Sequence, residues 1–192
     1  MNHTNSDTET NPWITHTTEQ VYESAWITVT KSDVTNPAGK PAIYSVVHFK
    51  NLAIGVLPLD KDYNTWLVGQ FRYPTNEYGW EIPEGGGKKD TDPVDSASRE
   101  LKEETGIVAK DYTELMRLHL SNSATDELAI VYLATNLTFE EAEPEESEQL
   151  QVKKLHLNEA FDMVMQGKIT DAISMAAILK AKWMLDNNKL FV

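Results

Sequence analysis

Three glutamates stand close together near the middle of the chain, in the segment RELKEETGI (99–107). Glu100, Glu103 and Glu104 are spaced i, i+3 and i+4, which in a helix places their side chains on one face. Carboxylates this close raise one another's pKa unless a cation lies between them. Oxygen ligands of this kind suit Mg²⁺ or Mn²⁺, with water and phosphate oxygens completing the shell. The spacing therefore indicates a divalent-metal site, and a solvated acidic helix is the alternative for the three glutamates alone.

A strand, a glycine turn and a helix are expected to position these carboxylates. The strand ends at WEIP, and the glycines that follow it are interpreted as a turn that lets the backbone approach a ligand or metal. Asp92 is the expected N-cap, Pro93 the first helical residue and Gly106 the C-terminal cap, so the helix spans about 93–105. Arg99 can hold a neighbouring carboxylate by a fork-shaped hydrogen bond, and we count it with the catalytic residues.

The remainder of the chain alternates between strand-like and helical patterns. Residues 1–11 are expected to be a disordered tail, because they carry few large apolar side chains. Strands surround the central helix and two helices close the chain, which argues for an α/β sandwich. The expected strands cover 25–34, 41–49, 52–59, 65–73, 113–120, 127–137 and 151–157, and the expected closing helices cover 158–167 and 170–185.

Composition excludes several classes of function. The 192 residues carry a net charge of −13 with no Lys/Arg cluster, so nucleic acid is not an expected partner. The chain has no cysteine, which removes disulfides and thiolate nucleophiles, and its five histidines are too scattered to form a metal site. It shows no secretory signal pattern and no apolar run of about 20 residues. A cytoplasmic protein without a membrane partner is the expectation.

The central segment resembles the Nudix box, in which a glycine, a glutamate and an Arg-Glu-apolar-x-Glu-Glu-x-Gly-apolar run follow at fixed spacing. Gly85 opens the box, and Arg99 through Ile107 supply the closing run. Thr91 stands where the family has its first glutamate, and Asp92, one residue later, is a possible substitute. The resemblance implies an α/β/α sandwich with a mixed central sheet over 51–192. It also implies Mg²⁺-dependent hydrolysis (Mn²⁺ being the alternative metal) of a nucleoside diphosphate linked to another group.

By residue matching, the resemblance assigns the metal to Glu100, Glu103, Glu104 and the backbone carbonyl of Glu84. The run VGQFRYPTNEYGWEIPEGG further resembles ADP-ribose and nucleoside-diphosphate-sugar pyrophosphatases, which implies that Arg72 and Glu81 contact substrate. A surface salt bridge for Arg72 and an exposed strand position for Glu81 are the alternatives. Gly85 and Gly86 are counted with the substrate-binding residues.

The catalytic base of this subgroup comes from an acidic loop after the box. Position matching in EPEESEQLQV favours Glu146, then Glu148, with Glu145 third, and solvated loop charge is the alternative. Glu127, at the beginning of the strand 127–137, is a further candidate, and a structural partner is the alternative.

The sequence leaves the choice of substrate open. Relatives that prefer ADP-ribose carry a proline about fifteen residues after the box, and LSNSATDE here lacks one. A nucleoside diphosphate sugar such as ADP-glucose, UDP-glucose or GDP-mannose is therefore equally admissible. Hydrolysis of a nucleoside triphosphate or another nucleotide is a second possibility, and nucleotide binding without catalysis is a third.

The subgroup also implies a homodimer formed through an N-terminal antiparallel β region, 12–50. Trp13, Tyr22 or Trp26 of that region could stack on a nucleobase, because an aromatic face accepts a flat π system. Core or interface packing is the alternative, and it is preferred for any one of the three. Among them, Trp26 is counted as substrate-binding.

Overall fold

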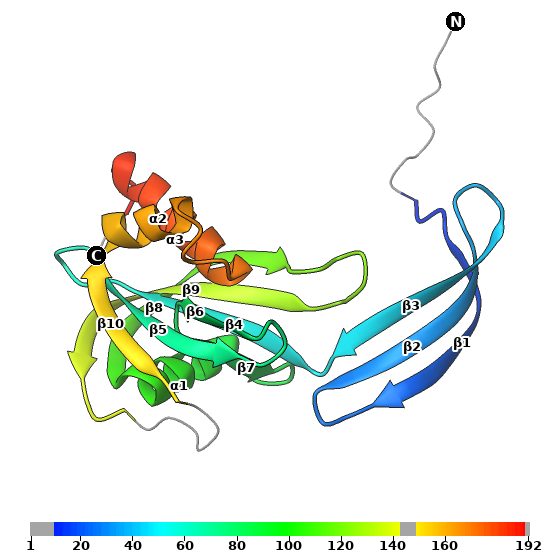
Figure 1. Ribbon diagram of the computed structural model, residues 1–192, viewed down its shortest axis with the longest axis horizontal. Helices are drawn as coiled ribbons and strands as arrows, with labels where there is room; N and C mark the ends of the chain where they lie inside the picture. The colour runs from blue at the N-terminus through cyan, green and yellow to red at the C-terminus, as the bar shows by residue number, and fades with distance from the viewer. Residues whose placement is uncertain (1–9, 143–148, 191–192) are drawn as a thin grey trace, which may run out of the picture. The chain divides into compact units, whose positions relative to one another are not determined.

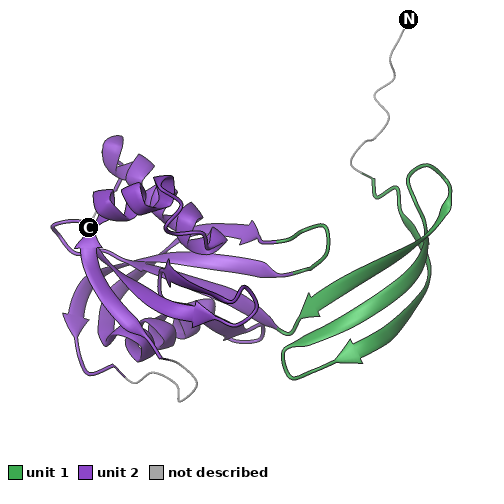
Figure 2. Ribbon diagram, viewed as in Figure 1, with its two compact units in different colours: residues 1–50, 121–126 green, residues 51–120, 127–192 purple. Residues whose placement is uncertain are grey.

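A computed structural model describes residues 10–142 and 149–190 and divides the chain into two compact units (Figure 2). The first unit ends at Lys50 and also includes Ser121–Asp126, and the second contains 51–120 and the chain from Glu127 onward. Residues 1–9 of the expected tail lie outside the described residues.

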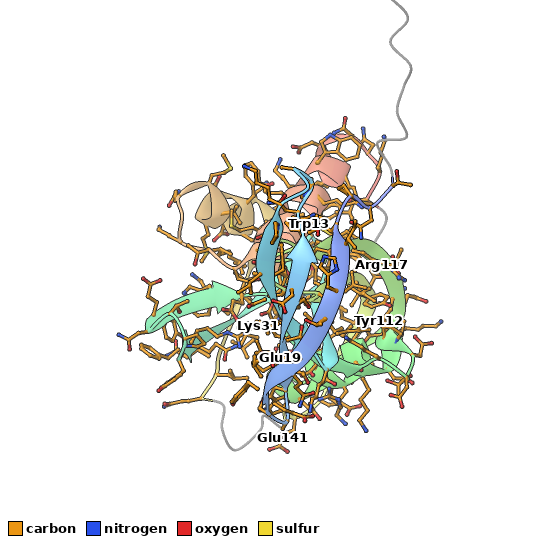
Figure 3. All side chains as sticks on the ribbon, turned by 90° about the vertical axis from the view of Figure 1, so that its right-hand side faces the viewer. Trp13, Glu19, Lys31, Tyr112, Arg117 and Glu141 are labelled. Carbon is orange, nitrogen blue, oxygen red and sulfur yellow. The ribbon has the colours of Figure 1, made fainter. Side chains whose placement is uncertain are left out.

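The first unit is a three-stranded antiparallel sheet in the order β1-β2-β3. Its strands are β1 (Ile14–Glu23), β2 (Ile27–Thr35) and β3 (Pro41–Phe49). Alternating β-branched and polar residues produce this sheet, and Lys31 of β2 pairs with Glu19 of β1 at 3.3 Å (Figure 3). The segment 121–126 is held on β3 by backbone bonds at Val47 and by the His48–Asp126 contact of 2.7 Å.

The second unit contains two sheets and three helices. One sheet has the order β7-β4-β9-β8 and is mixed, because β4 and β9 run parallel while the other neighbours are antiparallel. The other has the order β10-β5-β6 and is antiparallel. The strands are β4 (Asn51–Pro58), β5 (Asn64–Arg72), β6 (Glu77–Glu81), β7 (Glu84–Lys88), β8 (Ile107–His119), β9 (Leu128–Phe139) and β10 (Gln151–His156). The helices are α1 (Pro93–Thr105), α2 (Leu157–Met165) and α3 (Ala172–Asp186).

Side-chain alternation along the central strands creates two separate cores. On β4, Ile54 and Val56 join the core beneath α1, while Leu57 joins the core with α2 and α3. On β9, Ile130 belongs to the core beneath α1 and Val131 to the core with α2 and α3. Helix α1 therefore covers one side of the sheets, and α2 and α3 cover the other (Figure 1). The predicted α/β/α sandwich with a mixed sheet is confirmed, as is the N-terminal antiparallel β region.

The glycine run is a strand, so its interpretation as a turn is wrong. Gly85, Gly86 and Gly87 lie in β7 and pair with Ile54, Ala53 and Leu52 of β4. None of the three adopts a positive φ. A Cβ on Gly87 would come within 2.7 Å of the Ile54 side chain, so glycine serves here to allow close packing of α1 and β4 rather than an unusual dihedral.

In the part of the chain that the structure describes, no helix is both long enough and apolar enough to cross a membrane.

Candidate active site

Helix α1 presents the three glutamates as its capping signals predict. The Asp92 side chain accepts a hydrogen bond from the Val94 backbone N–H at 3.0 Å, and Pro93 begins the helix. Gly106 ends it in the left-handed conformation, with φ 70°. The side chain of Thr91 donates to the Lys88 carbonyl, so Thr91 and Asp92 both stabilise the entry to the helix.

Strand β7 lies against the face of α1 that carries the glutamates. A Cβ on Gly85 would lie 2.2 Å from the Glu100 carboxyl group, so Glu100 occupies the space that a side chain at position 85 would need. The Glu84 backbone N–H donates to Glu104 Oε2 at 3.1 Å. Glu100 is 8% and Glu104 3% exposed, and the side chain of Glu103 is 31% exposed. The strand thus brings the Glu84 backbone and two buried carboxylates together.

Arg99 links the carboxylates of the helix to the strand. Its Nη1 donates to Glu103 at 2.7 Å, and its Nη2 donates to Glu100 at 2.6 Å and to the Gly86 carbonyl at 3.0 Å. Burial acts to lower the pKa of Arg99, but the charges of Glu100 and Glu103 outweigh it and raise the pKa. Arg99 therefore stays cationic and offsets part of the repulsion between the glutamates.

A second arginine lies on the other side of β7. Arg72, at the end of β5, donates from Nε to both oxygens of Glu81 at 3.1 and 3.0 Å. Its Nη2 donates to Glu81 at 2.6 Å and to Glu84 Oε1 at 2.9 Å. Burial again acts to lower the pKa of Arg72, and Glu81 and Glu84 reverse this, so the pKa is raised. Gln70 also donates to Glu81, at 3.3 Å.

The side chain of Glu84 carries an incompletely paired carboxyl group. It is 13% exposed, and its Oε2 is buried without a hydrogen-bond partner among the described residues. Burial raises the pKa of this carboxyl group, and the nearby carboxylates of Asp171 and Glu81 raise it further, against the lowering effect of Arg72. Asp171 caps α3 by accepting from the Ser174 N–H at 2.7 Å, and Ser174 Oγ in turn accepts from the Ile82 N–H at 2.9 Å.

The residues present fit a divalent cation. The donors are carboxylate oxygens and a backbone carbonyl, which are the ligands that Mg²⁺ and Mn²⁺ take. The Glu100 carboxyl group packed against Gly85 and the unpartnered oxygen of Glu84 are further marks of a polar site. Among the described residues no three Asp, Glu, His or Cys side chains converge as a ready-made metal cage, and Arg99 takes up Glu100 and Glu103.

The other predicted site residues fall in three places. Glu145, Glu146 and Glu148 lie outside the described residues. Glu127 is half-buried in the second unit, directly before β9. Trp26 belongs to the first unit and lies 70% exposed in the turn between β1 and β2.

Sequence reasoning missed the Glu84 side chain, Gln70 and Asp171. For Glu84, only the backbone carbonyl was expected to take part. The signal was available for Asp171, because a TD pair directly before a helical pattern marks an N-cap. No local signal connects Asp171 with residues 72–84, since that proximity arises only from packing.

A cavity of about 450 Å³ shares no residue with this site. It is lined in part by Asp60, Asn136, Phe139 and Lys154. Asp60 is already engaged by the Asn64 and Asp62 backbone N–H groups and by Lys154 at 3.0 Å. Its size alone therefore does not make this cavity a reaction site.

The family models that the chain matches cover both units. Residues 49–176 match the NUDIX domain, and residues 13–47 match the nucleoside diphosphate sugar hydrolase N-terminal domain.

The similar proteins include two pyrophosphatases. The ADP-ribose pyrophosphatase of Bacillus subtilis (strain 168) is 33% identical over 162 residues, which are 83% of this chain and 87% of the relative. The ADP-ribose pyrophosphatase of Mycobacterium tuberculosis (strain ATCC 25618 / H37Rv) is 30% identical over 170 residues, 86% of this chain and 81% of the relative. The methanol dehydrogenase activator of Bacillus methanolicus is 29% identical over 163 residues, 84% of this chain and 88% of the relative.

A solved structure described as an ADP compounds hydrolase has the same fold, with a TM-score of 0.81 over 93% of this chain and 97% of that one. Its sequence identity of 23% supports the fold alone.

Proposed function

The chain belongs to the NUDIX family of hydrolases, and on that premise we propose that it cleaves the pyrophosphate bond of ADP-ribose or a nucleoside diphosphate sugar. Water adds across the P–O–P link and gives a nucleoside monophosphate and a sugar phosphate. The observation that carries the proposal is that Glu100 and Glu104 lie against β7. Arg99 joins Glu103 to the same strand through the Gly86 carbonyl, and Glu84 of this strand accepts a hydrogen bond from Arg72. The match of residues 13–47 to the N-terminal domain of nucleoside diphosphate sugar hydrolases supports this substrate class.

The arginine supplies the phosphate contact. Arg72 keeps its charge and is 41% exposed, so its guanidinium can donate to an oxygen of the diphosphate while Glu81 fixes its orientation. Positioning of this kind lowers the entropy that the reacting groups must lose in the transition state.

The metal-binding residues in this proposal are Glu100, Glu103, Glu104 and the Glu84 carbonyl. When bound there, Mg²⁺ would neutralise diphosphate oxygens and lower the pKa of water. Arg99 contacts both Glu100 and Glu103, so it orients these carboxylates. A carboxylate of the loop after β9 (Glu146, then Glu148 or Glu145) accepts the proton from the attacking water.

The first unit is proposed to form a homodimer and to place Trp26 against a nucleobase. Its sheet leaves large apolar side chains exposed: Ile14, Tyr22, Trp26 and Ile43 are 57%, 55%, 70% and 63% exposed. Exposed apolar side chains of this kind favour burial against a second copy.

The test is a substrate panel with Mg²⁺ and a phosphatase-coupled phosphate assay. The panel contains ADP-ribose, several nucleoside diphosphate sugars and nucleoside triphosphates. We expect phosphate release from the conjugates and no inorganic pyrophosphate. Turnover of triphosphates alone, with pyrophosphate as product, would exclude the proposed substrate class.

Glu103→Gln provides the variant that ties turnover to the site, because Glu103 is the most exposed of the three glutamates and the least needed for packing. We expect kcat to fall by about 100-fold or more. Asp95→Asn, an exposed carboxylate in the first turn of the same helix, is the matched control. Equal activity in the two variants would disconnect turnover from α1.

A further inference from the structure

The Arg72 guanidinium is held by two carboxylates from two different strands. Glu81 of β6 accepts from Nε and from Nη2, and Glu84 of β7 accepts from Nη2. A terminal guanidinium nitrogen carries two hydrogens. Glu81 and Glu84 together therefore use both hydrogens of Nη2. Within residues 10–142 and 149–190, Nη1 makes no hydrogen bond, so it is the donor edge left for a ligand.

Glu81 alone would leave the guanidinium partly free. A carboxylate on the Nε–Nη2 edge fixes the plane of the group, but one Nη2 hydrogen then remains open to water or to a second phosphate oxygen. Glu84 Oε1 accepts this second Nη2 hydrogen, with 2.9 Å between Nη2 and Oε1. Only with Glu84 present does the arginine offer a single, defined pair of donors, those of Nη1.

The Glu84 side chain is expected to destabilise the folded protein. Its Oε2 is buried without a partner among the described residues, and the side chain is only 13% exposed. A buried, unsatisfied acceptor is destabilising, and an acidic side chain more so. Other carboxylates, those of Glu81 and Asp171, lie close enough to raise its pKa. Groups that destabilise a fold in this way are characteristic of functional sites.

We propose that the Glu84 side chain is a positioning residue, which fixes Arg72 so that its Nη1 edge meets a phosphate oxygen of the substrate. This role is separate from that of the Glu84 backbone carbonyl, and it rests on the proposed hydrolysis of a nucleotide conjugate. Glu84 acts through Arg72 and need not touch the substrate.

The test uses three substitutions of Glu84 in the full-length chain, with KM, kcat and Tm measured for each. Glu84→Ala removes the contact, and Glu84→Asp keeps the charge but shortens the reach. Glu84→Gln keeps an oxygen that accepts from Arg72. We expect KM for the best conjugate to rise about 10-fold or more in Ala and Asp, as loss of a hydrogen bond to a charged group implies. We expect the KM of Glu84→Gln to stay within about 3-fold of the wild-type value. The Tm of Glu84→Ala should not fall.

Glu77→Ala is the matched control, because Glu77 lies directly opposite Arg72 in the β5–β6 register but is exposed and makes no hydrogen bond to it in the described structure. It should leave KM unchanged. In an Arg72→Ala background, Glu84→Ala should have no further effect on KM, since its action runs through the arginine.

Wild-type KM in Glu84→Ala and Glu84→Asp would overturn the inference. The inference would also fail if Glu84→Ala raised KM further in the Arg72→Ala background. A raised KM accompanied by a fall in Tm would overturn it too, because that result would mark Glu84 as a purely structural residue. If the wild type turns over no conjugate, the proposed function fails by itself. The inference is then decided by the Kd of ADP-ribose in EDTA, measured by calorimetry, which should rise in Ala and Asp but not in Gln. A wild type that does not bind ADP-ribose refutes both.

Discussion

Two arginines and four carboxylates pair at the residue scale. Arg99 holds Glu100 and Glu103, and Arg72 holds Glu81 and Glu84. Three glutamates on one helix face would repel one another, and Arg99 supplies part of the compensating charge before any metal binds. The arginine that opens the acidic run is therefore part of what makes that run compatible with a folded helix.

Gly85→Ala tests the close approach of β7 to α1. The new Cβ would lie 2.2 Å from the Glu100 carboxyl group and would displace it. We expect kcat/KM to fall by about 100-fold, as for loss of a group that stabilises the transition state. Unfolding in urea should show a loss of about 1–3 kcal/mol from overpacking.

Gly86→Ala is the comparison for stability. At that position a Cβ would meet only the Asn51 side chain, with Nδ2 at 3.3 Å, which can move by a few tenths of an ångström. A smaller loss of stability than in Gly85→Ala is expected. Equal losses would show that the strand, rather than Glu100, sets the requirement for glycine.

At the scale of elements, the strand β7 and the helix α1 together hold the carboxylates. The pairing of β7 with β4 fixes the strand, and the caps at Asp92 and Gly106 fix the ends of the helix. Glu104 then receives the Glu84 N–H from the strand. A ligand that binds between β7 and α1 only when the protein is folded should stabilise the whole second unit.

Magnesium should therefore raise Tm. We expect the midpoint to increase with Mg²⁺ concentration in the wild type, because binding to the native state shifts unfolding by mass action. The rise should largely disappear in Glu103→Gln and persist in Asp95→Asn. Thermal unfolding followed by circular dichroism, with EDTA as the metal-free reference, provides the measurement. An unchanged midpoint at saturating Mg²⁺ would contradict the metal assignment.

The turn between β4 and β5 depends on one carboxylate, Asp60. It accepts from the backbone N–H groups of Asp62 and Asn64, and Lys154 of β10 lies 3.0 Å away. Burial acts to raise the pKa of Asp60, but the hydrogen bonds from Asn64 and Lys154 lower it from 3.8 to about 2. Because the folded-state pKa is the lower one, the stabilisation is present above about pH 4 and disappears as the pH falls through about 2.

Asp60→Asn should remove this acid dependence. The side chain is 23% exposed, and a shift from 3.8 to about 2 corresponds to stabilisation on the order of 2 kcal/mol. The difference in unfolding free energy between wild type and variant should shrink between pH 4 and pH 2. Asp62→Asn, an exposed neighbour in the same turn, is the control and should follow the wild-type profile. A constant difference across this range would contradict the role of Asp60.

At the scale of the whole molecule, the two units differ in how well they bury their own residues. The second unit has two apolar cores, one on each side of its sheets. In the first unit, Val34 is the one apolar residue of the described strands that is below 9% exposed. Exposed apolar side chains gathered on one unit favour an interface with a second copy.

Light scattering after size exclusion should therefore give twice the mass of the chain. Tyr22 and Ile43 lie on one face of the first sheet, through the registers Tyr22–Val29–Val47 and Asp33–Ile43. Ile43→Asp replaces an exposed apolar side chain of this face with a second carboxylate beside Asp33 and should shift the protein to a monomer. His16→Ala, on an exposed polar position of β1, is the control. A wild type that remains monomeric at micromolar concentration would contradict the dimer.

The sequence alone determined the bounds of α1, the shared face of its three glutamates and the family. Each of these rests on residues within one short segment, because caps and helical spacing act over a few residues. It also predicted the three helices and most of the strands, since burial on one face imposes a period of two or 3.6 residues, but it did not identify β1 or β7 as strands.

The tertiary structure alone decided that Gly85–Gly87 form a strand, that Glu84 reaches Arg72, and that Ser121–Asp126 belong with the first unit. The same holds for the bond between Ile82 and Ser174, which are 92 residues apart in the sequence. Such contacts depend on which surfaces pack together, and no local propensity encodes that choice. For the glycines the decisive fact is the space on β7 that Glu100 and Ile54 occupy, which becomes visible only when the helix lies against the strand.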